Sequence, residues 1–262
     1  MNAGRINLFK DIINVIIDEH IEFTNEEAII LSYYNTLVSR SMETMLLLDN
    51  NMTYSVGVIL RSCAEVFLYL KYFFHDEEKT NCRINNAYWW AKYKANETFI
   101  KGLRSKVLDK NGNEAKREKY LKELTSIGYS NEKTFEKYLK TELNKTYTKN
   151  MSVYDRRNWY NEDGKINGIL DLAKLVDCES EYYSVIMPMN TVVHSGDIIE
   201  NKKNVPGGYV LENFIDRNTV LYHTNRYVTL ITKEVLHYFK AQEYCYELVR
   251  KINDTELKLY KS

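Results

Sequence analysis

An arginine and a glutamate interrupt the most apolar stretch of the sequence, residues 54–74. Arg61 and Glu65 are four residues apart, which places them about 40° apart on the same face of a helix. Charges in such a helix are costly unless they are paired and hydrogen-bonded. One interpretation is a guanidinium that Glu65 holds towards a cavity, where it meets a phosphate. The other is a buried ion pair that ties this helix to a neighbour.

A second polar group falls on a tyrosine-rich helical pattern later in the chain. Asn190 and His194 are again four residues apart, and Tyr183 and Met187 extend the same face. Pro188 lies inside this pattern, where it removes one backbone hydrogen bond and predicts a kink. A histidine at the end of a helix is also favoured by the helix dipole alone, so a purely structural role for His194 stays open.

The other chemistry-bearing residues form no motif of a known enzyme class. The sequence has no Gly-rich phosphate loop, no HExxH and no GxSxG, which excludes P-loop nucleotide hydrolysis and α/β-hydrolase chemistry. The four cysteines are scattered and form no CxxC pair, so neither a disulfide framework nor a zinc site is expected. A metal site made of Glu65, His194 and Asp197 is a disfavoured alternative. We therefore expect no metal and no cofactor.

The composition is that of an ordinary globular protein of 262 residues, with 44% hydrophobic and 27% charged residues. The 36 basic and 36 acidic residues cancel, so the whole chain offers no electrostatic argument for nucleic acid or membranes. Residues 101–150 are locally basic, with 13 Lys and Arg against 7 Asp and Glu. We interpret that stretch as a solvated helical hairpin in preference to a nucleic-acid surface.

Helical periodicity dominates the chain, and no alternation typical of strands persists beyond a few residues. Thr24 and Glu27 form a capping-box pattern, Thr53 is expected to cap the next helix, and Pro206 falls in an expected loop. The segment 109–113 is expected to form a turn. The predicted helices are 6–21, 24–48, 53–74, 81–107, 114–126, 131–143, 169–176, 179–193 and 211–252.

These helices predict one all-α domain over residues 1–262. It would be a helical bundle with a core of about 5–100 and 165–252 and a charged helical insertion at about 101–160. The helix at 53–74 is apolar almost all round and should be the buried central one. The N-terminus reads as an amphipathic helix, and the apolar stretch carries central charges. We therefore expect a cytoplasmic, soluble protein without signal peptide or membrane span.

The segment 59–65 has the pattern R-S-x-x-E at Arg61, Ser62 and Glu65, and the tyrosine-rich helix ends in Val-His at His194. Together these resemble an uncharacterised bacterial all-helical family, a domain of unknown function. Trp159 and the short helix before the tyrosine-rich segment fit the same pattern. The resemblance covers about residues 30–200 apart from the charged insertion. Asn190 stands where that family usually has serine.

More remotely, Asn190 and His194 resemble the RNxxxH signature of HEPN (higher eukaryotes and prokaryotes nucleotide-binding) domains. Many of those are metal-independent RNases of toxin–antitoxin and antiphage systems and act as homodimers. The resemblance implies that the histidine assists proton transfer at the 2′-hydroxyl and that the arginine stabilises the phosphate. Met189 stands at the arginine position here. Arg61 supplies the missing charge if the two helices face each other.

One functional hypothesis is an RNase-like effector acting on RNA. His194 would be the general acid and base, Arg61 would stabilise phosphate charge and Glu65 would orient Arg61. Asn190 would hold the substrate or His194. The further substrate-binding candidates are Tyr183, Ser62 and Ser195. The implied partners are RNA, an antitoxin or defence-system protein, and a second copy of the chain, with no membrane.

The alternative hypothesis is a non-catalytic helical module in which the same residues form a buried polar lock. Such a module would bind a protein partner through tyrosine-rich surface, or a nucleotide ligand without hydrolysis. An open, positively charged cleft in which Arg61 and His194 converge favours the RNase. Complete burial of Arg61 and His194, with no pocket between them, favours the binding module.

Overall fold

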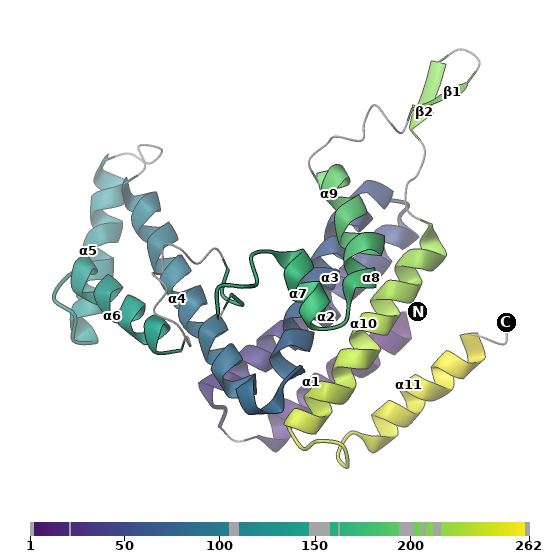
Figure 1. Cartoon of the computed structure of the whole chain (residues 1–262), viewed down its shortest axis with the longest axis horizontal. Helices are drawn as coiled ribbons and strands as arrows, with labels where there is room; N and C mark the ends of the chain where they lie inside the picture. The colour runs from purple at the N-terminus through teal and green to yellow at the C-terminus, as the bar shows by residue number, and fades with distance from the viewer. Residues whose placement is uncertain are drawn as a thin grey trace. The chain divides into compact units, whose positions relative to one another are not determined.

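The protein is a chain of helices with one short hairpin (Figure 1). The expected all-α fold is confirmed within the part of the chain that the structure describes. The only strands there are β1 (Lys202–Val205) and β2 (Gly208–Leu211), which pair antiparallel with Lys202 opposite Leu211. No described helix is long and apolar enough to cross a membrane. The computed structural model describes residues 3–20, 22–104, 110–146, 158–161, 163–193, 202–205, 208–211 and 216–259.

The helices form two compact units, Met1–Glu77 with Ile169–Ser262, and Glu78–Gly168. The second unit contains the charged insertion expected at 101–160 and also the helix before it. The first unit contains α1 (Ala3–Glu19), α2 (Asn25–Asp49), α3 (Thr53–Phe74), α7 (Ile169–Leu175), α8 (Glu179–Glu181), η2 (Tyr182–Ile186), α9 (Met187–Val193), the hairpin, α10 (Arg217–Tyr238) and α11 (Tyr246–Leu259). The second contains α4 (Thr80–Arg104), α5 (Lys110–Ser126) and α6 (Glu132–Lys145), after the short η1 (Glu77–Lys79).

The central helix of the first unit is α3, as its apolar sequence predicts. It contacts α2, α7, α9, α10 and η2. Tyr33 of α2 meets Phe73 edge-on at 5.4 Å between ring centroids, and Tyr227 of α10 stacks on Phe67 at 4.5 Å. Burying a side chain such as Phe67 contributes about 2–3 kcal/mol relative to leaving it in water. Packing on several faces therefore fixes the position of every residue on α3.

The start of α2 is as predicted, whereas the start of α3 differs. Thr24 accepts a hydrogen bond from the backbone N–H of Glu27, and the Glu27 carboxylate accepts one from the Thr24 N–H. The chain then leaves α2 through Asn51 at a positive φ of 57°. The N–H of Met52 returns to the Leu47 carbonyl at 2.9 Å, which closes a Schellman turn. Met52 therefore becomes the N-cap of α3, and Thr53 is its first helical residue instead of its cap.

The prediction of one long helix over 211–252 is wrong, because the chain forms two helices with a turn between them. The first, α10, begins after Asp216, whose carboxylate accepts the Thr219 N–H at 2.8 Å. It ends in another Schellman turn, in which Lys240 has a φ of 53° and the Ala241 N–H bonds to the Leu236 carbonyl. In place of the loop expected around Pro206, the residues on either side pair as the β1–β2 hairpin, and Pro206 itself lies outside the described residues.

The second unit has its own small hydrophobic core. Tyr93 of α4 packs with Leu139 and Leu143 of α6, and four partly buried aromatic residues surround them: Trp89, Trp90, Phe135 and Tyr138. The prediction of a turn at 109–113 is wrong for the last four of these residues, because α5 begins at Lys110. The start of α6 is capped by Asn131, which accepts the Thr134 N–H at 3.0 Å.

Candidate functional site

Arg61 and Glu65 form an ion pair at the edge of the central helix. The Arg61 Nε–H donates to Glu65 Oε1 at 3.0 Å, and both partners come from α3. Their side chains are 25% and 27% exposed. The pair is therefore neither fully buried nor fully solvated, and the guanidinium keeps further N–H donors that Glu65 Oε1 does not use.

The neighbours of Arg61 on α3 show which element lies beside it. Gly57 and Ala64 are buried and lie within about 60° of Arg61 around the helix axis. This face is not the one that packs on Tyr33 or Tyr227. Besides α2 and α10, α3 contacts α7, η2 and α9, and we infer that these three elements cover the Gly57–Ala64 face, with α9 among them. Arg61 then lies at the margin of the α3–α9 contact.

The tyrosine-rich segment contains a π-helical turn directly before its proline. The helix expected over 179–193 is divided into α8, the π-turn η2 and α9. Pro188 has no N–H, and the preceding Met187 N–H bonds five residues back to the Tyr182 carbonyl. A π-turn, a feature found often at functional sites, therefore precedes Pro188, and the kink expected at Pro188 stays a prediction.

The residues of this segment differ in how deeply the structure buries them. Met189, at the position of the HEPN arginine, is buried in the core of the first unit. Asn190 is half-buried, whereas Tyr183 and Met187 are exposed. An apolar side chain at position 189 is therefore what the packing requires, and any charge for a phosphate must come from another element.

Two of the predicted site residues, His194 and Ser195, lie outside the described residues, as does Asp197. Of the remainder, Arg61, Ser62 and Glu65 lie on α3, with Ser62 half-buried. Asn190 lies on α9, which contacts α3. The structure thus brings the two helices of the candidate site together, and the convergence of Arg61 and His194 stays a prediction.

A second polar cluster was not predicted from the sequence. Glu181, at the end of α8, has a side chain only 2% exposed and forms an ion pair with Arg226 of α10. The Ser180 hydroxyl donates to the other Glu181 oxygen at 2.7 Å. These contacts join α8 to α10 directly before the π-turn. They therefore hold in place the start of the segment that continues into α9.

His223 lies beside this cluster on α10. It is buried, and its Nδ1 is 3.3 Å from the hydroxyl of Tyr227. Burial lowers the pKa of His223 below its ordinary value, against the opposing influence of the Glu181 carboxylate. His223 is therefore uncharged at neutral pH, and the charged members of the cluster are Glu181 and Arg226.

Cysteine and metal chemistry find no support among the described residues. All four cysteines are free thiols. Burial raises the pKa of Cys63 to about 12 and that of Cys178 to about 11, so neither forms a thiolate at neutral pH. Nor does any group of three or more His, Cys, Asp and Glu within the described ranges have the arrangement of a metal site.

Comparison with known proteins identifies a family but no characterised relative. No curated protein and no solved structure matches the chain. Residues 27–203 match the model of one protein family, a stretch that includes α3 with Arg61 and α9 with Asn190. The expectation of a domain-of-unknown-function family is thereby confirmed. The chain belongs to DUF5677, a family of unknown function.

Proposed function

We propose that the margin between α3 and α9 is the active site of a HEPN-like, metal-independent endoribonuclease. The observation that carries the proposal is the position of the Arg61–Glu65 pair. The central helix is otherwise buried on most faces, yet its arginine is held by Glu65 at 3.0 Å and remains one quarter exposed. A guanidinium so placed is oriented and still open to a ligand.

The chemistry assigned to this site is transesterification of a phosphodiester. His194 takes the proton of the 2′-hydroxyl, and the 2′-oxygen attacks phosphorus. The bond to the 5′-oxygen breaks, and that oxygen takes a proton from the imidazolium of His194 as it leaves, which restores the neutral imidazole. The products are a 2′,3′-cyclic phosphate and a 5′-hydroxyl. An imidazole suits this role because its ordinary pKa lies near neutrality.

Arg61 stabilises the negative charge that develops on the phosphate oxygens, and Glu65 fixes the direction of the guanidinium. This arrangement replaces the motif arginine, whose position is taken by the buried Met189. Asn190 holds the substrate or His194. Tyr183, Ser62 and Ser195 are assigned to substrate contacts around these residues.

The biological role that follows is an effector of a toxin–antitoxin or antiphage system. Such an effector would act as a homodimer that joins two sites, with RNA as substrate and an antitoxin or defence-system protein as its partner. Cytoplasmic location belongs to the same proposal.

The proposal is tested by incubating purified RNA with the wild-type protein in the presence of EDTA. Cleavage is expected, with 2′,3′-cyclic phosphate ends, and expression of the protein should arrest bacterial growth. His194→Ala should abolish both effects. His75→Ala is the matched control, because His75 is an exposed histidine at the end of α3. If RNA stays intact in the presence of folded wild-type protein, the proposal of a ribonuclease is overturned.

The second candidate function is a non-catalytic binding module. It is favoured by the exposure of Tyr183 and Met187, which lie one turn apart and offer a ring and an apolar side chain to a partner. If RNA stays intact, capture of a partner that is lost in a Tyr183→Ala, Met187→Ala variant supports this alternative. Retention of that partner by the variant contradicts it.

A further inference from the structure

The zero net charge of the chain conceals a strong charge asymmetry between its two units. Residues 78–168 contain 20 Lys and Arg against 12 Asp and Glu, a net charge of +8. The first unit contains 16 against 24, a net charge of −8. An excess of this size within 91 residues creates a local field that attracts polyanions, although the whole molecule is neutral.

Several lysines of the second unit lie over aromatic rings. On α4, the Lys92 Nζ lies 4.3 Å from the centroid of the Tyr88 ring and 5.4 Å from that of Trp89. The Lys94 Nζ lies 5.1 Å from the ring of Trp90. Trp89 and Trp90 are each partly exposed. Ammonium groups and rings therefore occur side by side on two faces of α4, because Lys92 and Lys94 lie about 160° apart around the helix axis.

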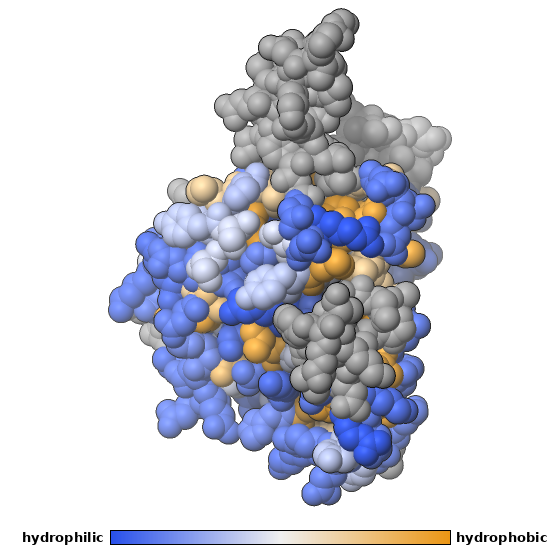
Figure 2. Space-filling view, turned by 90° about the vertical axis from the view of Figure 1, so that its right-hand side faces the viewer, coloured by the Kyte–Doolittle hydropathy of each residue, from blue (hydrophilic) through white to orange (hydrophobic). Residues whose placement is uncertain are grey.

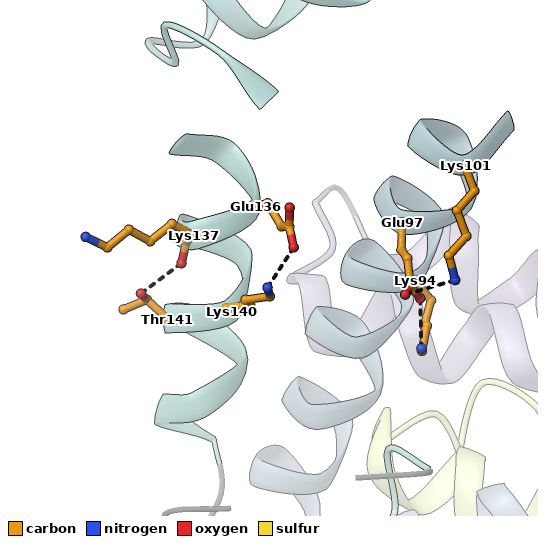
Figure 3. A network of polar contacts seen from close by, with 7 residues as sticks. All are labelled: Lys94, Glu97, Lys101, Glu136, Lys137, Lys140 and Thr141. Carbon is orange, nitrogen blue, oxygen red and sulfur yellow. Dashed lines mark hydrogen bonds and ion pairs between the residues drawn. The ribbon is translucent and has the colours of Figure 1, made fainter. Parts of the chain in front are cut away.

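The pattern continues from α4 onto α6. The Lys140 Nζ lies 5.9 Å from the ring of Tyr93 on α4. Figure 3 shows Glu136 and Lys140 on the side of α6 towards α4, whereas Lys137 points away. We call the four residues Lys94, Lys101, Lys140 and Trp90 the Lys–Trp surface.

The two carboxylates that pair with these three lysines, Glu97 and Glu136, leave an excess of one positive charge. Lys94 and Lys101 both pair with Glu97, at 2.9 and 3.1 Å (Figure 3). Hydrogen bonds from these two lysines lower the pKa of Glu97, so the trio carries one negative and two positive charges. Lys101 is 72% exposed, and exposed ion pairs are worth about 1 kcal/mol or less. The lysines can therefore exchange Glu97 for a phosphate at little cost.

The spacing of these residues produces a continuous stripe along α4. Four residues lie on one face of the helix, because they are spaced by four, three and four positions: Trp90, Lys94, Glu97 and Lys101. One ring and two ammonium groups are thus spread over three turns of α4. This length is enough to contact several nucleotides of a single strand.

We propose that the Lys–Trp surface binds single-stranded RNA. Lysines contact the phosphates, while the exposed part of the Trp90 ring stacks with a base, a combination typical of proteins that bind single strands without strong sequence preference. An acidic protein would use the charges but gain little from the ring beside them. The inference deepens the proposed ribonuclease by naming single-stranded RNA as its substrate class, and only that assignment rests on the proposed function.

The test is fluorescence anisotropy of a labelled 2′-O-methyl oligouridine of about 12 nucleotides with the full-length protein. Because this probe lacks a 2′-hydroxyl, it reports binding whether or not the protein cleaves RNA. Binding is expected to weaken with salt, with a slope of about −3 for roughly four phosphate contacts. If the probe binds but RNA is not cleaved, the proposed ribonuclease is overturned and the proposed RNA-binding surface is supported.

The decisive variant is Lys94→Gln, Lys101→Gln. It should weaken binding about tenfold and reduce the salt slope by about 1.4, since each phosphate contact on a single strand contributes about 0.7. The matched control is Lys119→Gln, Lys122→Gln on α5, which removes the same charge from two other exposed lysines of the unit. The control should weaken binding by less than about threefold. Equal loss in both variants means that net charge alone attracts RNA, and overturns the proposed surface.

Two further measurements separate RNA from an acidic partner. Trp90→Leu should weaken binding and reduce the quenching of tryptophan fluorescence by the probe, whereas Glu97→Gln should tighten binding about twofold to threefold. Polyglutamate of equal charge should displace the probe poorly. Displacement as strong as that by unlabelled RNA, or no binding of the probe at all, overturns the proposal.

Discussion

Two arginine–glutamate pairs in the first unit are built in opposite ways. Arg61 and Glu65 pair within one helix, and both side chains are about one quarter exposed. Arg226 and Glu181 join two elements 45 residues apart, and the Glu181 side chain is 2% exposed. A pair formed within one helix can lose its arginine to a ligand without moving any element. A pair with a buried carboxylate cannot, because the charge left behind would have no water to solvate it.

This difference separates a functional from a structural use of the same two side chains. Glu181 is held by Arg226 and by Ser180, and it anchors the chain just before the π-turn. Among the described residues, no hydrogen bond or ion pair joins Arg61 or Glu65 to another element. We therefore assign the Glu181–Arg226 pair to the positioning of α9 and the Arg61–Glu65 pair to substrate, and the following predictions test that division.

The largest expected effect is on stability, from Arg226→Ala. This change leaves the buried Glu181 carboxylate unpaired and should lower the free energy of unfolding by about 3 kcal/mol. Urea denaturation followed by circular dichroism measures it. The double variant Glu181→Gln, Arg226→Ala should be milder, because no buried charge is stranded. A loss below about 1 kcal/mol for the single variant contradicts a structural role for the pair.

Glu65→Gln should lower RNA cleavage about tenfold while leaving stability almost unchanged. The amide still accepts a hydrogen bond from Arg61, but the charge that directs the guanidinium is gone, and charge-assisted hydrogen bonds are about twice as strong as neutral ones. Initial cleavage rates at saturating RNA report the change. Unaltered cleavage would show that Glu65 does not orient Arg61 for catalysis.

A smaller effect is expected from pH, through His223 beside the buried pair. Burial lowers the pKa of His223 below its ordinary 6.5, so the unfolded chain binds a proton at a pH where the folded protein does not. Stability should therefore be complete above about pH 7 and decline as the pH falls below about 6.5, until the folded protein is protonated as well. His223→Gln should flatten this part of the stability curve between pH 7 and 5. If the variant shows the same dependence of unfolding free energy on pH, groups other than His223 cause the loss of stability.

The smallest effect is expected at a third arginine, Arg217, which pairs with Asp49 at 2.5 Å on the surface. Both side chains are more than half exposed, and such pairs contribute about 0.5 kcal/mol. Arg217→Ala should change neither RNA cleavage nor the unfolding free energy by more than that. A larger loss of stability would mean that exposure is a poor guide to the role of an arginine pair in this protein.

The features predicted correctly from the sequence are those with local signals. The capping box of Thr24 and Glu27 spans four residues, and the pairing of Arg61 with Glu65 spans one helical turn. The apolar pattern of α3 identified the central helix because burial on several faces requires it. In each case the residues that interact are also close in the chain.

The features that were missed depend on unusual backbone conformations or on distant partners. Lys240 ends α10 in the left-handed region without a glycine or proline to indicate a stop, so the apolar pattern suggested one continuous helix. The hairpin strands have four residues each, too few for a reliable alternation. The pair between Glu181 and Arg226 joins elements far apart in sequence, and neither residue has a charged partner at helical spacing that would have indicated it.

The most surprising region is therefore the one that surrounds the candidate site. The π-turn, the buried Glu181 and the Schellman turn at Asp177 all lie within about three turns of helix before α9. The Cys178 N–H closes that turn on the Ala173 carbonyl at 2.8 Å. Departures from ideal local geometry are concentrated where proteins hold functional residues.

The most direct test of the account is the cleavage of RNA by Arg61→Ala, measured beside its free energy of unfolding. The account predicts a loss of cleavage of about a hundredfold or more. It also predicts a change in unfolding free energy below about 1 kcal/mol, because the pair is partly exposed and confined to one helix. Cleavage equal to that of the wild type, or a loss of activity that merely follows a collapse in stability, would contradict the assignment of Arg61 to the substrate.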